Sequence, residues 1–246
     1  MVKPVSLRGF QKGFQGVSLR GFRGFQIFLW ELCVCIKYLS LGELGCGTGG
    51  MWLGKEEMIN RCSLLVLSDF SAGMLKKAKE TLGEKKVTYQ VIDIQSIPYH
   101  DHSFDAVIAN MMLYHVPDLE KGLREVRRVL KPGGAFYSAT YGERGMMAYL
   151  CDMFSGYGIQ DRINRSFTLQ NGESVLRRFF HSVQKYLYDD ALAVTSAEDM
   201  ADYIFSLSGM SALQKLPRET VRAVLAAHMQ NGVLRIPKEY GMFISH

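Results

Sequence analysis

Strand and helix signals alternate along this chain from Ile36 to about residue 140, and that alternation limits the folds open to it. Short apolar runs of strand length are separated by segments with apolar residues at helical spacing. Parallel strands cannot be joined by tight turns, so each pair needs a crossing segment, which is usually a helix. The pattern therefore predicts an α/β fold in which helices cover both faces of a mostly parallel sheet.

The expected strands are 37–44, 63–67, 87–91, 106–110 and 135–140, and the expected helices are 51–60, 72–82 and 119–130. The helix at 119–130 has the clearest signals, because Asp118 can cap its first turn and apolar residues follow at helical spacing. The Lys-Pro-Gly-Gly segment at 131–134 is expected to end it.

The pattern changes beyond Thr140. Residues 141–170 are rich in Met, Tyr and Phe, and a helix at 173–181 and strands at 183–188 and 240–245 are expected around a helical pair. Thr195 and Glu198 fit a capping box that opens the first helix of this pair, and the second should run from near Pro217 to Asn231-Gly232. A helical insertion therefore lies between the last two expected strands.

The first 24 residues contain a duplicated unit, at 5–10 and 17–22, rich in Gly, Arg and Phe. Such a segment lacks the periodicity to bury a face, so 1–24 is expected to be a disordered, low-complexity leader. Binding of single-stranded RNA by these Arg-Gly-Phe units is the alternative. The remaining residues, 25–246, are expected to form one domain.

The net charge of +5 comes from the same end of the chain. Residues 1–40 hold six basic residues and one acidic residue, so the rest of the chain is neutral and no nucleic-acid partner is expected. The apolar run at 25–39 contains Glu31 and Lys37 and is shorter than the roughly 20 residues of a membrane span, so no membrane partner is expected either. The sequence gives no indication of the oligomeric state.

The five cysteines are scattered, without the C-x-x-C spacing of metal or redox sites. We expect reduced thiols, a cytoplasmic protein and no metal centre.

A glycine-rich stretch, Glu43 to Gly50, follows the first expected strand and opens a helix. Glycines allow a sharp turn and a close approach to a ligand, and the helix N-terminus offers free N–H groups. Gly45, Gly47 and Gly50 also satisfy the G-x-G-x-x-G dinucleotide pattern, so the stretch alone does not choose between cofactors.

Four further motifs follow in order: Asp69-Phe70-Ser71 with Met74, Leu75 and Ala78; Asp93; Phe104 to Val107; and Leu130 to Gly134. With the glycine stretch, they resemble the class I S-adenosylmethionine (SAM)-dependent methyltransferases, most closely the methyltransferase type 11 group, which includes ubiquinone/menaquinone-type enzymes. The resemblance covers about residues 41–140. It implies a Rossmann-like three-layer sandwich with a mostly parallel seven-stranded sheet, an antiparallel last strand and a helical insertion or lid. The core would be 36–140, and the lid and substrate region 141–180 and 190–232.

The resemblance also implies the cofactor, SAM, and the residues that hold it: Glu43, Gly45, Cys46, Gly47, Gly49, Asp69, Phe70, Asp93, Ile94 and Asn110. It assigns Asp69 to the ribose hydroxyls and Asp93, with the Ile94 backbone, to the adenine amino group. Helix capping by Asp69, turn capping by Asp93 and plain strand termination by Asn110 are the structural alternatives. Gly42 departs from the family, which prefers a large apolar residue there.

Methyl transfer needs alignment, desolvation and, for some acceptors, a base. The candidates are His115 and Tyr114, and further on Tyr141 and Glu143, which follow expected strand ends. A packing role is the alternative for His115. The apolar residues Met146, Met147, Tyr149, Met153, Phe154 and Tyr157 either line a pocket for a small acceptor or pack a lid helix.

The expected function is methyl transfer from SAM to a small-molecule acceptor by in-line displacement. A methyltransferase for RNA or protein, a dinucleotide-dependent oxidoreductase and an inactive binding fold are the alternatives.

Overall fold

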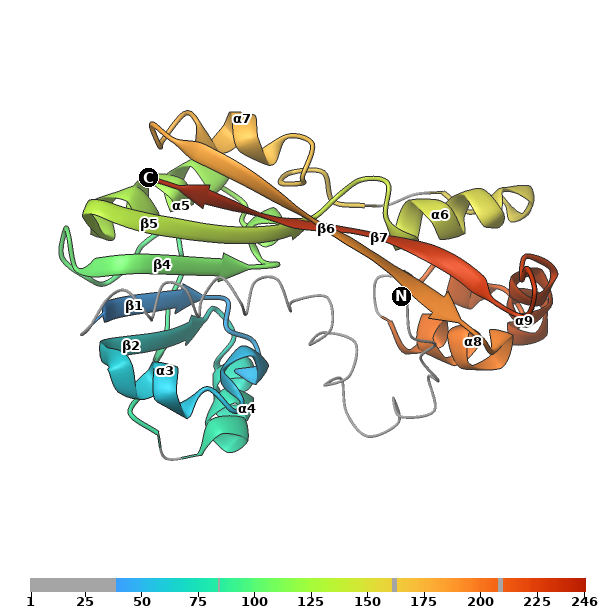
Figure 1. The fold of residues 1–246 in the computed structure, drawn as a ribbon, viewed down its shortest axis with the longest axis horizontal. Helices are drawn as coiled ribbons and strands as arrows, with labels where there is room; N and C mark the ends of the chain where they lie inside the picture. The colour runs from blue at the N-terminus through green and yellow to red at the C-terminus, as the bar shows by residue number, and fades with distance from the viewer. Residues whose placement is uncertain (1–38, 84, 161–162, 208–209) are drawn as a thin grey trace. The chain divides into compact units, whose positions relative to one another are not determined.

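The structure, a computed structural model, describes residues 39–246 apart from 84, 161–162 and 208–209. Within these residues the strands are β1 (Leu39–Leu44), β2 (Cys62–Asp69), β3 (Thr88–Val91), β4 (Phe104–Asn110), β5 (Leu130–Tyr141), β6 (Val183–Val194) and β7 (Leu234–Ser245). They form one sheet in the order β3-β2-β1-β4-β5-β7-β6. The pairs β1–β2, β1–β4, β2–β3 and β4–β5 are parallel, whereas β7 runs against β5 (Figure 1). The predicted fold class is confirmed.

The described α-helices are α3 (Glu56–Arg61), α4 (Ala72–Leu82), α5 (Leu119–Val129), α6 (Met146–Met153), α7 (Gly172–Leu176), α8 (Ala197–Ser206) and α9 (Arg218–Ala227). Short 3-10 turns are η2 (Gly50–Trp52), η3 (Leu113–His115), η4 (Ser155–Tyr157) and η6 (Leu213–Lys215). The expected helix 72–82 coincides with α4, and Asp118 caps α5 as predicted, accepting a hydrogen bond from the Lys121 amide at 2.9 Å.

The expected helix at 51–60 is wrong. The chain instead forms η2, passes through the extended Leu53 and the left-handed Gly54 (φ 68°), and only then enters α3. A positive φ at Gly54 breaks the helical hydrogen-bond ladder, because an α-helix needs negative φ at every residue.

Helix α5 ends at Val129, within one residue of the expected end, but the strand expected at 135–140 begins earlier and includes residues 131–134. Those residues belong to β5, which begins at Leu130 and shifts register against β4 between Phe104 and Ala106, with Gly133 at φ 77°. This local irregularity admits the Pro-Gly-Gly segment into a strand.

Elements after residue 170 differ from the expectations at their ends. The expected helix 173–181 ends at Leu176, and the cap of α8 is Ser196, whose hydroxyl accepts from the Asp199 amide, rather than Thr195. Helix α9 ends at Ala227 rather than at Asn231-Gly232. These two residues form a turn before β7.

The described residues divide into two compact units. The core unit comprises 39–142, 164–187 and 241–246, and the helical unit comprises 143–163 and 188–240. The division cuts β6 after Leu187 and β7 after Tyr240. The helical unit is therefore smaller than the expected lid and substrate region, because residues 164–187 belong to the core unit.

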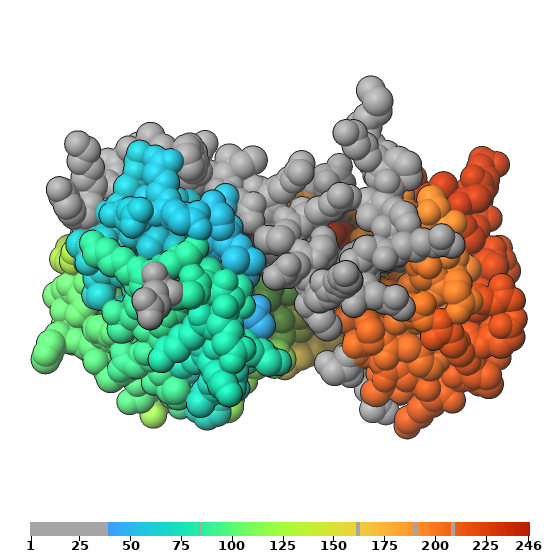
Figure 2. Space-filling view, turned by 90° about the horizontal axis from the view of Figure 1, so that it is seen from below, coloured from blue at the N-terminus to red at the C-terminus, as the bar shows by residue number. Residues whose placement is uncertain are grey.

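Each unit has its own apolar core. In the core unit, side chains of β1, β2, β4 and β5 pack with those of α5 and of residues 164–187, Phe136 and Phe167 among them. The outer surface of α3 and α4, coloured cyan to green, lies on one face of this unit (Figure 2). In the helical unit, Leu150 of α6 and Phe154, which directly follows α6, pack with α8, α9 and the adjoining ends of β6 and β7.

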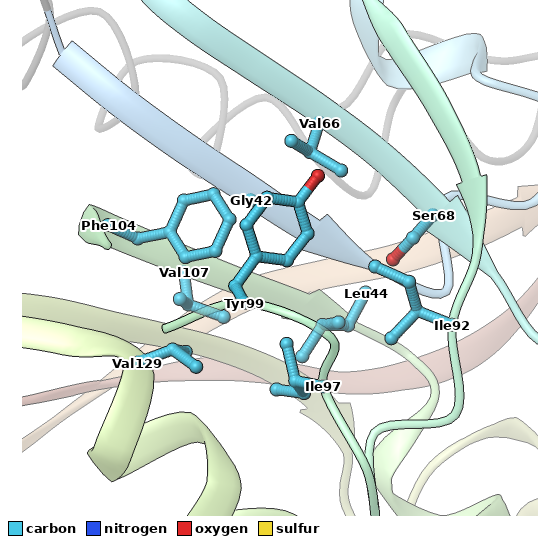
Figure 3. A pocket seen from close by; sticks show the side chains of 10 residues that line it. All are labelled: Gly42, Leu44, Val66, Ser68, Ile92, Ile97, Tyr99, Phe104, Val107 and Val129. Carbon is cyan, nitrogen blue, oxygen red and sulfur yellow. The ribbon is translucent and has the colours of Figure 1, made fainter. Parts of the chain in front are cut away.

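A small cavity of about 10 Å³ lies beside Gly42, where the rings of Tyr99 and Phe104 meet edge to face at 4.9 Å (Figure 3). A Cβ on Gly42 would lie 3.3 Å from the Phe104 ring, so Phe104 fills much of the space that a large side chain at 42 would take. Successive side chains of a strand point to opposite faces, so Gly42 and the cavity lie across β1 from Glu43. The cavity holds about one water molecule and is not a ligand site.

Candidate cofactor site

Most of the residues predicted to hold the cofactor meet at one edge of the sheet. Glu43, Asp69 and Asn110 lie at the carboxyl ends of β1, β2 and β4, and Asp93 follows the end of β3. These four strands are consecutive neighbours in the sheet. In open α/β sheets, ligands bind at this edge, in the crevice where the strand order reverses.

The turn after β1 has the geometry that the sequence predicts for a ligand loop. Gly45, Gly47 and Gly49 have φ of 71°, 55° and 72°, a region that favours glycine. A Cβ on Gly45 would lie 2.8 Å from Met112, so that glycine is also needed for close packing, whereas a Cβ on Gly47 would meet nothing within 4 Å. The loop is thus packed tightly at Gly45 and open at Gly47.

Asp69 braces this loop. Its Oδ2 accepts from the Gly47 amide at 2.9 Å, and its Oδ1 accepts from the Ser71 amide at 2.8 Å. The cap of α4 is Ser71, whose hydroxyl accepts from the Met74 amide, so the alternative of Asp69 as that helix cap is wrong.

Glu43 is a buried carboxyl, only 2% exposed. Trp52 Nε1 donates to its Oε2 at 2.6 Å, and the Glu43 carbonyl accepts from the Ser68 hydroxyl at 2.8 Å. Burial raises the pKa of Glu43 to about 7; the Trp52 hydrogen bond opposes that rise and the negative charge of Asp69 adds to it. Glu43 is therefore close to half-protonated at neutral pH.

Cys46 lies in the same loop and is also buried. Burial, with the nearby charges of Glu43 and Asp69, raises the pKa of its thiol above the ordinary value. The thiol therefore stays protonated, and only the backbone of Cys46 is suited to ligand contact.

Asn110 carries an unsatisfied acceptor. Its Nδ2 contacts Met51 Sδ at 3.0 Å, while its Oδ1 is buried with no hydrogen-bond partner among the described residues. The next residue, Met111, has φ 52°. Buried carbonyl oxygens without a donor are uncommon in folded proteins, so this atom points to a ligand donor.

The two residues predicted for the adenine end, Asp93 and Ile94, and the predicted cofactor residue Phe70 have different surroundings. Asp93 caps a turn, with Oδ1 accepting from the Gln95 amide at 2.8 Å and its carbonyl accepting from the Ser96 amide. The Ile94 side chain is buried beside Gly122 of α5. Phe70 is 76% exposed, together with Met74 and Val91, which are also exposed.

Tyr114 and His115 lie in η3, beyond the end of β4, in an aromatic cluster. The Tyr114 ring lies 4.5 Å from that of His115 and 4.6 Å from that of Tyr141, measured between centroids. Ser166 Oγ donates to the Tyr114 carbonyl at 3.0 Å, and Tyr141 Oη donates to the Asn164 carbonyl at 2.8 Å. His115 is exposed, whereas Glu143 belongs to the helical unit.

The apolar residues of α6 and its surroundings have mostly a packing role. Phe154 is fully buried in the helical unit, and Met146, Met147, Tyr149 and Met153 pack partly buried against that core. Tyr157 is 49% exposed.

Sequence reasoning missed Trp52, Met51 and Met112, all of which contact predicted site residues. The one indication in the sequence is that Trp52 lies nine residues after Glu43, the acidic residue near the end of β1. Its partner was not identifiable without the turn that brings the two together.

Among the described residues, no group of three His, Cys, Asp or Glu side chains could hold a metal ion. In the same part of the chain, no helix is both long and apolar enough to cross a membrane.

A family model described as a methyltransferase domain matches residues 42–138. The chain is 28% identical over 177 residues to a demethylmenaquinone methyltransferase of Desulfitobacterium hafniense, a match covering 70% of this chain and 66% of that protein. It is 24% identical over 180 residues to the ubiquinone/menaquinone biosynthesis C-methyltransferase UbiE of Salmonella arizonae, covering 70% and 71%. A match of 32% identity to the polyketide synthase-nonribosomal peptide synthetase phmA of Phaeosphaeria nodorum covers 43% of this chain and only 3% of that protein.

Solved structures share the fold. YcgJ of Bacillus subtilis superimposes with a TM-score of 0.59 at 17% identity, covering 89% of this chain and 96% of YcgJ. The methyltransferase CalH, solved with S-adenosylhomocysteine (SAH), gives a TM-score of 0.56 at 17% identity, covering 89% of this chain and 55% of CalH. With the ordered motifs, the sheet topology and the matched family model, these findings place the chain among the class I SAM-dependent methyltransferases, enzymes whose cofactor is S-adenosylmethionine.

Proposed function

We propose that the chain transfers a methyl group from SAM to a small-molecule acceptor at the carboxyl edge of β1, β2 and β4. The observation that carries the proposal is the unsatisfied Asn110 Oδ1 beside a glycine loop that two acidic side chains, Glu43 and Asp69, flank. Acceptor groups gathered around an open loop fit a cofactor that carries hydroxyl, ammonium and sulfonium groups.

The residues present fit this cofactor. Asp69 would accept from the ribose hydroxyls, since each of its oxygens has a lone pair left beside the bonds to Gly47 and Ser71. Glu43 and Asn110 would hold the methionine end, and Asp93 with the Ile94 backbone the adenine. When bound, SAM supplies an activated methyl group with a neutral leaving group.

The protein's part in the reaction is alignment and exclusion of water, because displacement at a sulfonium needs little further assistance. The cluster of Tyr114, His115 and Tyr141 would position the acceptor beyond the end of β4. If the acceptor carries a proton, His115 is the proposed base, because a neutral imidazole nitrogen can accept a proton from a bound acceptor. Exposure of His115 leaves it accessible to an acceptor.

A small acceptor is supported by the similarity of this chain to the demethylmenaquinone methyltransferase and to the C-methyltransferase UbiE. The cytoplasm is the proposed compartment, supported by the scattered positions of the five cysteines in the sequence.

Calorimetry of the purified full chain with SAH and with NAD tests the cofactor assignment. We expect binding of SAH and none of NAD; NAD binding without a response to SAH would overturn the proposal. Incubation of isotopically labelled SAM with metabolite extracts, followed by mass spectrometry, would then identify the acceptor.

A further inference from the structure

Glu43 is a carboxyl group whose ionised form is disfavoured by its burial in the fold. It is 2% exposed, and the side chains opposite it on the neighbouring strands are Leu67 and Ile108, both apolar. Among the described residues, the ionisable groups coupled electrostatically to Glu43 are Asp69 from β2 and Cys46 from the glycine loop, and neither is a cation. A carboxylate in such a place lacks an opposite charge.

Trp52 offsets part of this cost with one directed hydrogen bond. Its indole is 1% exposed and lies in η2, immediately after the glycine loop, and Nε1 donates to Oε2 at 2.6 Å. Among the described residues, no donor bonds to the other oxygen, Oε1. An indole N–H can only donate, so Trp52 favours the ionised carboxylate over the neutral acid.

We propose that binding of the cofactor's ammonium group expels a proton from Glu43, and that Trp52 is the positioning residue that sets the pH at which this exchange occurs. The inference rests on the proposed site, in which Glu43 faces the methionine end of the cofactor. The ammonium supplies the missing cation, so the carboxylate becomes the favoured form and its proton passes to the solvent. Cofactor affinity therefore falls as the medium becomes acidic, by up to about tenfold per pH unit below neutrality.

Calorimetry of SAH binding to the full chain at pH 6.5, in two buffers of different ionisation enthalpy, measures the protons released. We expect release of more than half a proton per SAH. Methylthioadenosine keeps the adenosine and the thioether but lacks the ammonium, so it should bind with no release. Glu43→Gln, which keeps an acceptor for Trp52, should bind SAH with no release and with an affinity that varies little from pH 6 to 7.5.

Trp52→Phe tests the second half of the proposal. Removal of the N–H should move the midpoint of the affinity–pH curve upward, whereas a purely structural role would lower affinity equally at every pH. An unmoved midpoint overturns the role of Trp52. If this variant does not fold, SAH binding to the wild type and to Glu43→Gln still tests whether cofactor binding releases the Glu43 proton.

The remaining outcomes separate the two proposals. SAH binding without proton release, or equal release with methylthioadenosine, overturns the exchange while leaving the methyltransferase site in place. Absence of SAH binding at every pH overturns the proposed site and the exchange with it.

Discussion

The core unit and the helical unit differ in what they bury. Among the described residues, all of the buried polar and charged side chains belong to the core unit: Glu43, Ser68, Ser138, Thr140, Thr168 and Ser245. The core of the helical unit is apolar throughout, built from Leu, Ile, Val, Met, Ala and Phe. Burial of a polar group lowers stability unless the group forms hydrogen bonds. The core unit therefore contains buried polar side chains that packing alone does not require. We expect changes in the core unit to affect ligand binding and changes in the helical unit to affect stability.

The largest effect is expected from Phe154→Ala in the helical unit. Loss of a fully buried phenyl ring should lower the free energy of unfolding by about 3–5 kcal/mol, measured by urea denaturation. Asp152→Ala, on the exposed face of α6, is the matched control and should change it by less than about 0.5 kcal/mol. A small effect of Phe154→Ala would show that this core is not tightly packed.

Glu43 should make the ligand-free protein less stable as the pH rises. Its pKa is 4.5 in the unfolded chain and about 7 when folded, so the folded state binds the extra proton between these values. The free energy of unfolding should therefore fall by about 3 kcal/mol from pH 4.5 to 7 and level off above that. Comparison of denaturation curves for the wild type and Glu43→Gln isolates this contribution, and parallel pH profiles would contradict it.

Asp69→Ala should weaken SAH binding by about 1.5–3 kcal/mol through lost charge-assisted hydrogen bonds. Asp101→Ala, which removes an exposed partner of Arg128, is the control and should leave SAH affinity unchanged. Unchanged affinity in Asp69→Ala, with the fold intact, would restrict this residue to bracing the glycine loop.

The smallest effect is expected from deletion of residues 1–24, which lie outside the described residues. Stability and SAH affinity should change by less than about 0.5 kcal/mol. A truncated chain that unfolds or loses SAH would show that the leader is part of the site.

Predictions from the sequence were most accurate for features that depend on one residue and its near neighbours in the chain. The sequence alone predicted the cap at Asp118 and the glycine turn after β1, because helix caps and left-handed turns depend on few neighbouring residues. The predicted helix 51–60 was wrong because Gly54 adopts a left-handed conformation, and the sequence does not show which glycine will do so. Contacts across the fold, such as Trp52 with Glu43 and Asn110 with Met51, depend on how the turn after β1 closes, and no spacing rule predicts them.

The buried Cys46 has a consequence for covalent chemistry at this site. A buried thiol whose pKa is raised reacts slowly with alkylating agents and oxidants. An inhibitor with a thiol-reactive group, placed against the glycine loop by its adenosine part, would therefore react with Cys46 only slowly. Ligands that contact this thiol would have to rely on reversible interactions.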